Sequence, residues 1–225
     1  MIDPTARVHP SADVEADVSV GPRTSVWHRA VLRNGASLGA DCVIGRDAFI
    51  DEGVHLGNKV KVQNAALVYH GVTVEDSVFI GPGAILTNDR HPRAVTATGR
   101  LARDADWTVS PIVIAHGASI GAGAIVVAGC DVGRYAMVGA GAVVTHTVPD
   151  HAMVAGNPAR GIGWACACGQ RLIDSTGHPA PAARERYARD PELSCPACGR
   201  RYAFTLEEGI LHERQGPAVA HGARS

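Results

Sequence analysis

Four of the six cysteines stand in two close pairs near the C-terminal end of the chain. The pairs are Cys166 with Cys168 and Cys195 with Cys198; a glycine follows each pair, and 26 residues separate them. Thiolates at such spacing are typical ligands of tetrahedral Zn²⁺, and four protein ligands leave no position open for catalysis. The spacing predicts a structural zinc site of the zinc-ribbon type. Four free thiols or two disulfides are the alternatives.

A second set of polar residues recurs at intervals of 18 positions, as Asn34, Glu52, His70 and Asn88. An imidazole can accept a proton, and an amide can position a nucleophile or an oxyanion. If 18 residues make one turn of a coil, these side chains form one column along its edge. Asn88 and His70 are therefore the candidate catalytic residues, and a solvated polar edge is the alternative.

A six-residue repeat supplies the elements that would position this column. From Val8, every sixth residue up to Leu86 is Val, Ile or Leu, and the pattern resumes from Ile114 to Val144, so that all 20 positions are aliphatic. Four positions after each aliphatic residue comes a small or β-branched residue, with one exception at Arg90. Cys42 and Cys130 belong to this second set and are expected to be buried spacers.

This period suits a triangular coil in which three hexads make one turn and equal positions stack ~4.8 Å apart. Glycine follows the aliphatic residue in eight of the 20 hexads, as at Gly21 and Gly121. These glycines are expected to serve corners where the backbone needs a positive φ. The repeat predicts an all-β solenoid, because the strands of a β-sandwich would not keep one phase from Val8 to Leu86.

One polar segment, residues 89–110, interrupts the repeat directly after Asn88. Long excursions from a regular scaffold are usually functional, and an aromatic side chain on a loop, here Trp107, normally finds a partner surface. The segment is therefore predicted to be a functional loop, with a tolerated insertion as the alternative.

The composition excludes several classes of function. The chain carries 21 basic and 22 acidic residues, so no strong field favours nucleic acid or an anionic membrane. No apolar stretch approaches the ~20 residues of a membrane helix, and no signal peptide opens the chain, so a cytoplasmic protein is expected. Between the cysteine pairs, Arg184 and Arg186 alternate with Glu185, which is typical of a solvated linker.

We expect a solenoid over 1–163, a zinc-ribbon-like module over 164–213 and a disordered tail over 214–225.

The solenoid resembles the hexapeptide-repeat N-acetyltransferases that acylate amino sugars on nucleotides. The narrower matches are to enzymes that acetylate the 3-amino group of UDP-2-acetamido-3-amino-2,3-dideoxyglucuronate or of dTDP-3-amino-3,6-dideoxyhexoses. The matching phrases are, in chain order, Val26-Trp27-His28, Val62-Gln63-Asn64, Val68-Tyr69, Gly81-Pro82, Thr87-Asn88-Asp89, Pro92-Arg93, the run from Gly117 to Ala122, the run from Val138 to Thr145, Val148-Pro149 and Gly156-Asn157-Pro158-Ala159-Arg160.

That resemblance implies a left-handed parallel β-helix, a homotrimer, acetyl-CoA as co-substrate and direct attack of the sugar amine on the thioester. It implies a nucleotide sugar near the loop, with the candidate substrate-binding residues Asp89, Arg93, Trp107, Asn64 and Tyr69. It also implies acetyl-CoA along the C-terminal coils, at Gly121, Ala124, Gly139, Ala140, Ala142, Asn157 and Arg160.

The chain departs from the family at His70, where the family often has Glu. That exchange changes the acid–base arrangement of the site.

Two other functions remain open. A γ-type carbonic anhydrase would hold zinc between subunits by three histidines, but Thr73 stands between His55 and His91 where such spacing would need a ligand. A non-catalytic trimeric scaffold would need no loop beside a cleft.

Overall fold

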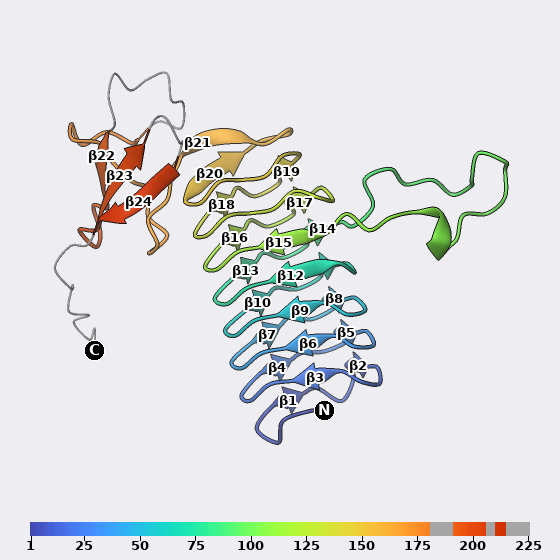
Figure 1. The fold of residues 1–225 in the computed structure, drawn as a ribbon. Coiled ribbons are helices and arrows are strands. Elements are labelled where there is room, and N and C mark those ends of the chain that lie inside the picture. The colour runs from blue at the N-terminus through green and yellow to red at the C-terminus, as the bar shows by residue number, and fades with distance from the viewer. Residues whose placement is uncertain (181–190, 206–209, 215–225) are drawn as a thin grey trace.

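The computed structural model describes residues 1–180, 191–205 and 210–214. Its main body is a parallel β-solenoid with three faces, which rises from the N-terminus to the β19–β20 region (Figure 1). The predicted solenoid of hexapeptide coils is therefore confirmed.

The turns contribute short strands to three faces. The first face comprises β1 (Arg7–Val8), β4 (Ser25–Val26), β7 (Val43–Ile44), β10 (Lys61–Val62), β13 (Phe79–Ile80), β16 (Ser119–Ile120), β18 (Met137–Val138), β20 (Ala152–Ala155) and β21 (Arg160–Trp164). The second comprises β2 (Asp13–Val14), β5 (Val31–Leu32), β8 (Phe49–Ile50), β11 (Leu67–Val68), β14 (Ile85–Leu86), β17 (Ile125–Val126) and β19 (Val143–Val144). The third comprises β3 (Ser19–Val20), β6 (Ser37–Leu38), β9 (His55–Leu56), β12 (Val72–Val74) and β15 (Ile112–Ile114). After β15 the third face continues as the isolated bridges Ile114–Val132 and Val132–Val148.

The strand register confirms the 18-residue turn. Val8 pairs with Val26 on the first face, and Val68 pairs with Ile50 on the second. The turn that contains the loop is longer, so that Val74 of β12 pairs with Ile114 of β15. The solenoid thus keeps its register across the insertion, and the loop leaves from one corner.

The two predicted columns form the interior of the prism. The aliphatic residues from Val20 to Val144 are all buried, and Val8 and Val14 pack against them at the N-terminal end. Cys42 and Cys130 are 0% and 1% exposed, as predicted for spacers.

The glycines that follow the aliphatic residues have a different role from the predicted one. Gly21 and Gly121 do not adopt a positive φ; the positive-φ glycines lie two positions later, as at Gly123. A Cβ atom on Gly121 would lie 2.4 Å from the backbone nitrogen of Ala140 and 2.6 Å from the carbonyl carbon of Gly139. These glycines are therefore needed because the backbones of successive coils approach closely.

Gly121→Ala should consequently destabilise the solenoid more than Gly123→Ala. The first substitution forces a methyl group into a neighbouring backbone, which should cost about 3 kcal/mol. The second places its methyl group in open space at a φ of 64°, and the left-handed conformation alone costs about 1 kcal/mol. Urea unfolding of the two variants measures the difference, and equal losses would contradict the close-approach explanation.

The interrupting loop departs after β14, returns before β15 and extends away from the prism (Figure 1). Its single helical turn is η1 (Asp104–Asp106). An ion pair of 2.6 Å joins Arg100 to Asp106, and an antiparallel bridge joins Val95 to Leu101. The loop therefore has a defined internal structure.

A small antiparallel sheet follows the solenoid and lies beside its last coils (Figure 1). It consists of β22 (Glu192–Ser194), β23 (Arg201–Thr205) and β24 (Ile210–Arg214). Strand β21 crosses the predicted boundary at residue 163, and Arg214, assigned to the tail, ends β24. Residues 215–225 of that tail and the 181–190 linker lie outside the described residues. Within the described ranges, no helix has the length and apolar character to cross a membrane.

Candidate functional site

A pocket of about 420 Å³ lies where the loop meets the solenoid. Three of the predicted site residues line it: His70, Asn88 and Trp107. Its full lining is Asp51, Glu52, His70, Asn88, Asp104, Trp107 and Val109. The interval of 18 residues between His70 and Asn88 therefore predicted correctly that these two side chains lie together and beside the loop.

The solenoid positions the polar column through the second face. Glu52, His70 and Asn88 each follow a strand of that face, namely β8, β11 and β14, which are neighbours in the sheet. The loop contributes to the lining of the pocket, and its return is fixed where the backbone nitrogen of Ser110 donates to the carbonyl oxygen of Asn88 at 2.9 Å.

His70 is held in one tautomer by the coil below it. Its Nδ1 lies 2.7 Å from the carbonyl oxygen of Glu52. A carbonyl oxygen only accepts, so Nδ1 carries the proton and Nε2 keeps its lone pair in the neutral ring. This is the arrangement of a general base.

Asp51 organises this corner, and the sequence reasoning missed it. Its Oδ2 accepts from the backbone nitrogen of His70 at 3.1 Å, and its Oδ1 accepts from that of Glu52 at 2.8 Å. The Arg33 guanidinium lies 3.4 Å from Oδ1. The sequence could have indicated this contact, because Arg33 and Asp51 are 18 positions apart and therefore stack on successive coils.

The other predicted substrate residues lie outside this pocket. Asp89 accepts a hydrogen bond from the backbone nitrogen of His91 at 2.7 Å, and Arg93 donates to the carbonyl oxygen of Pro92 at 2.9 Å. Tyr69 packs against Phe49, with 5.7 Å between ring centroids. Asn64 lines a separate pocket on another corner of the prism, together with Trp27 and Arg46.

The predicted acetyl-CoA residues follow strands of the first face. Gly121 and Gly139 come directly after β16 and β18, and Gly121 lies against the backbone of Gly139 and Ala140 in the next coil. Ala124 and Ala142 are completely buried, so their side chains fill the prism and do not face solvent. This corner and the His70 corner are different edges of one solenoid.

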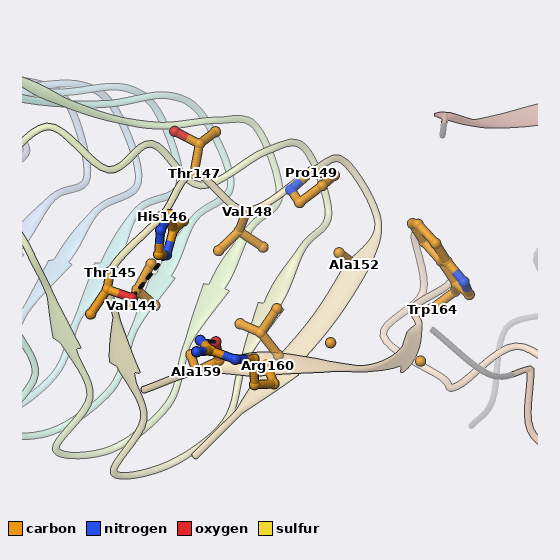
Figure 2. Close-up of a pocket in the computed structure, with 13 residues that line it drawn as sticks. Val144, Thr145, His146, Thr147, Val148, Pro149, Ala152, Ala159, Arg160 and Trp164 are labelled. Carbon is orange, nitrogen blue, oxygen red and sulfur yellow. Dashed lines mark hydrogen bonds between the residues drawn. The ribbon is translucent and has the colours of Figure 1, made fainter. Parts of the chain in front are cut away.

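A third pocket, of about 300 Å³, lies at the C-terminal end of the solenoid (Figure 2). Trp164 forms one end, Thr145 and His146 form the other, and Val148 lies between them (Figure 2). Arg160, which was predicted to meet CoA phosphates, also lines it. The pocket itself was not predicted, because Trp164 belongs to the strand that leaves the repeat.

The four cysteines of the C-terminal module form a cluster. The Sγ atoms of Cys166 and Cys198 are 3.5 Å apart, as are those of Cys168 and Cys195, and all four lie within 4.8 Å of one another. Zn–S bonds of ~2.3 Å in a tetrahedron place the sulfurs ~3.8 Å apart, so this donor set fits a zinc ion. Burial and hydrogen bonding to neighbouring thiols raise the pKa of Cys168 to about 12 when no cation is present. Over the described ranges, no other group of three or more His, Cys, Asp or Glu side chains comes together in this way.

The sequence and structure are similar to those of known proteins. Residues 35–70 and 111–146 match the family described as the hexapeptide repeat of succinyl-transferase. The chain is 40% identical over 103 residues to the dTDP-3-amino-3,6-dideoxy-alpha-D-galactopyranose 3-N-acetyltransferase of Aneurinibacillus thermoaerophilus, a match that covers 45% of this chain and 44% of that protein. It is 35% identical over 120 residues to the mitochondrial gamma carbonic anhydrase 1 of Arabidopsis thaliana, covering 46% and 42%.

Among solved structures, a hexapeptide-repeat containing acetyltransferase from Vibrio cholerae O1 biovar eltor, complexed with acetyl coenzyme A, superimposes with a TM-score of 0.49 at 26% identity, covering 58% of this chain and 70% of that one. The chain spans less than half the length of the two curated relatives. The repeat match and the three-faced architecture together show that residues 35–70 and 111–146 are hexapeptide repeats folded into a parallel β-helix.

Proposed function

We propose that this protein is an acetyl-CoA-dependent N-acetyltransferase that acts on the 3-amino group of a nucleotide-linked amino sugar. The observation that carries the proposal is the fixed tautomer of His70, which leaves Nε2 as a proton acceptor in the pocket that Asn88 and Trp107 also line. The 40% identity to a dTDP-3-amino sugar 3-N-acetyltransferase supports this choice of acceptor.

The reaction requires one proton acceptor and no covalent enzyme intermediate. The sugar amine attacks the thioester carbonyl carbon, a C–N bond forms, and Nε2 of His70 takes the proton that the nitrogen loses. The C–S bond then breaks, and the CoA thiolate leaves and is protonated from His70. Asn88 supplies an amide that can hold the sugar beside the amine or stabilise the developing oxyanion.

The proposal includes a homotrimer. His70 and Asn88 follow strands of the second face, whereas Gly121, Gly139 and Ala140 follow strands of the first. A site that uses both corners is most simply completed by the neighbouring subunit. Each active site would then combine the loop corner of one solenoid with the CoA corner of the next.

The proposal also includes a structural zinc ion at the four cysteines. All four positions would be filled by Cys166, Cys168, Cys195 and Cys198, so the ion would supply folding free energy and no chemistry at the acetyl group. A cytoplasmic location follows as part of the same proposal, because a reducing compartment keeps thiols available to a metal.

The alternative of a γ-class carbonic anhydrase draws support from the 35% identity to a plant relative. His55 and His116 line one pocket of about 440 Å³, together with Glu75, Asp76 and Arg134. Thr73 occupies the intervening coil, where the histidine spacing would need a ligand, and the identity to the 3-N-acetyltransferase is higher, at 40%. The acetyltransferase is therefore the better-supported function.

Asn88→Ala should lower turnover by about 100-fold, because one well-placed polar group near the reacting atoms contributes on that order. The core is untouched by this change, so light scattering should give the same particle mass for the variant and the wild type. Unchanged kinetics would remove Asn88 from the site.

A thiol-release assay with acetyl-CoA and a panel of UDP- and dTDP-linked amino sugars tests the function as a whole. Turnover with a 3-amino sugar, and none with its 3-hydroxy counterpart, is the expected result. Absence of turnover across the panel, together with absence of CoA binding, would favour the non-catalytic scaffold.

A further inference from the structure

The C-terminal module contacts the last coil of the solenoid through Tyr202, which is completely buried. The Tyr202 hydroxyl accepts a hydrogen bond from the backbone nitrogen of Ala167 at 3.1 Å and lies 3.2 Å from the sulfur of Cys166. Since its oxygen already accepts from Ala167, its own proton is available to the Cys166 sulfur. Tyr202 is thus a direct neighbour of the proposed metal site.

The ring of Tyr202 continues this connection into the solenoid. It packs edge-on against His151, with 5.2 Å between centroids, and His151 packs on Tyr135 at 5.2 Å, which in turn meets His116 at 5.4 Å. Nδ1 of His151 donates to the carbonyl oxygen of Ala165 at 2.9 Å. Burial lowers the pKa of His151, in keeping with a neutral ring in this stack.

A second contact of the module supports the wall of the 300 Å³ pocket at the C-terminal end of the solenoid, which we call the end pocket. The Trp164 ring, which lines that pocket, lies 4.8 Å from the ring of Phe204. Phe204 is on β23, two positions after Tyr202, and both side chains are buried. Trp164 is therefore held between the end of the solenoid and the module.

Strand β21 connects Trp164 to Arg160, the cationic residue that lines the same pocket. Arg160 begins β21 and Trp164 ends it. The strand is paired antiparallel with β20, with a register irregularity between Met153 and Val154. Cys166 follows only two residues after Trp164, so the first cysteine pair lies directly beyond the end of β21.

The module is small and has few elements of its own. The described residues between 164 and 214 contribute three short strands beyond β21, and units of this size usually need a metal or a disulfide to remain folded. A metal ion would join the pair after Trp164 to Cys195 and Cys198, which lie between β22 and β23. Without it, β23 would lose its connection to β21 at this point, and Phe204 and Tyr202 would lose theirs to the last coil.

We infer that the metal-loaded module is a positioning element for the end pocket. Through Phe204 it fixes Trp164, and through β21 it fixes Arg160, so that the pocket keeps the shape that accepts an anionic ligand with an apolar or aromatic part. This inference rests on the proposed function, in which that ligand is coenzyme A. Tyr202 and Phe204 are positioning residues, since neither lines the pocket.

Calorimetric titration of CoA into the trimer, before and after removal of the metal by a chelator, tests the inference. Metal removal should weaken CoA binding at least ~10-fold, and added Zn²⁺ should restore it. In steady-state kinetics the KM for acetyl-CoA should rise while the KM for the amino sugar stays constant. Equal CoA affinity in the metal-free and metal-loaded protein would overturn the inference.

Two substitutions and a second readout separate this inference from the proposed function. Phe204→Leu should retain the metal and weaken CoA binding. The control is Phe49→Leu, which removes an aromatic ring from β8, far from the module in the sequence; it should leave CoA affinity unchanged. Hydrogen exchange should accelerate in Arg160–Trp164 on chelation and stay constant in β5 and β8. Accelerated exchange in a protein that never binds CoA would keep the positioning role and reject the acetyltransferase; unchanged exchange would reject the positioning role itself.

Discussion

His70→Gln should reduce the turnover of acetyl transfer by about 1,000-fold, which lies within the usual contribution of a positioned general base. The glutamine amide can still donate to the carbonyl oxygen of Glu52, which the imidazole Nδ1 meets at 2.7 Å. It has no group that accepts a proton at neutral pH. The variant should therefore fold and bind both substrates, and its KM values should change little.

Steady-state thiol release measures this loss, and His55→Gln is the matched control. His55 is also an exposed histidine of the solenoid, on β9, and its Nδ1 lies 2.8 Å from the Ser37 hydroxyl. It does not line the His70 pocket. Equal turnover in wild type and His70→Gln would show that the amine loses its proton to another acceptor, and the catalytic assignment would fall.

Cys195→Ser should abolish stable metal binding and unfold the C-terminal module. Apparent zinc binding free energies of ~12 kcal/mol, shared by four thiolates, give each ligand about 3 kcal/mol, so removal of one weakens binding on the order of 100-fold. Cys195 is buried and its sulfur lies 3.5 Å from that of Cys168, so the smaller serine hydroxyl would also leave a gap among the three remaining sulfurs.

Metal content after dialysis, measured by mass spectrometry, reports this effect. Wild type should carry one zinc ion per chain, and Cys195→Ser should carry almost none. Cys42→Ser is the control, since Cys42 is equally buried but lies in the small-residue column of the prism. Stoichiometric metal in Cys195→Ser would contradict the assignment of the cluster as a zinc site.

The fold was predictable because the six-residue repeat determines both which side chains pack inside the prism and which residues stack on successive coils. Every aliphatic position of the repeat points into the prism, so that counting by 18 places His70 below Asn88 without any structure. The cysteine pairs were predictable for a similar reason, since metal-ligand spacing is a local property of the sequence.

The remaining features depend on geometry that the period does not contain. The function of Gly121 is set by a backbone contact with Gly139 and Ala140, which no φ preference reveals. The ring stack of His116, Tyr135 and His151 has intervals of 19 and 16 residues, so that counting by 18 misses it.

The end pocket was missed because its wall depends on the packing of a module with no repeat. Trp164 meets Phe204 across 39 intervening residues, and nothing in the local sequence of either predicts the contact. Roles for Asp89, Arg93, Asn64 and Tyr69 came only from the resemblance, and they remain predictions, since within a single chain these residues lie outside the His70 pocket.

The central claim is transfer of an acetyl group to a 3-amino sugar. Its most direct test is NMR of the wild-type protein incubated with carbonyl-¹³C acetyl-CoA and dTDP-3-amino-3,6-dideoxygalactose. We expect the thioester carbonyl signal to be replaced by an amide carbonyl signal coupled to the proton at C3 of the sugar, and this change to be absent with His70→Gln. Persistence of the thioester signal with this sugar and with its UDP-linked 3-amino counterparts would contradict the claim.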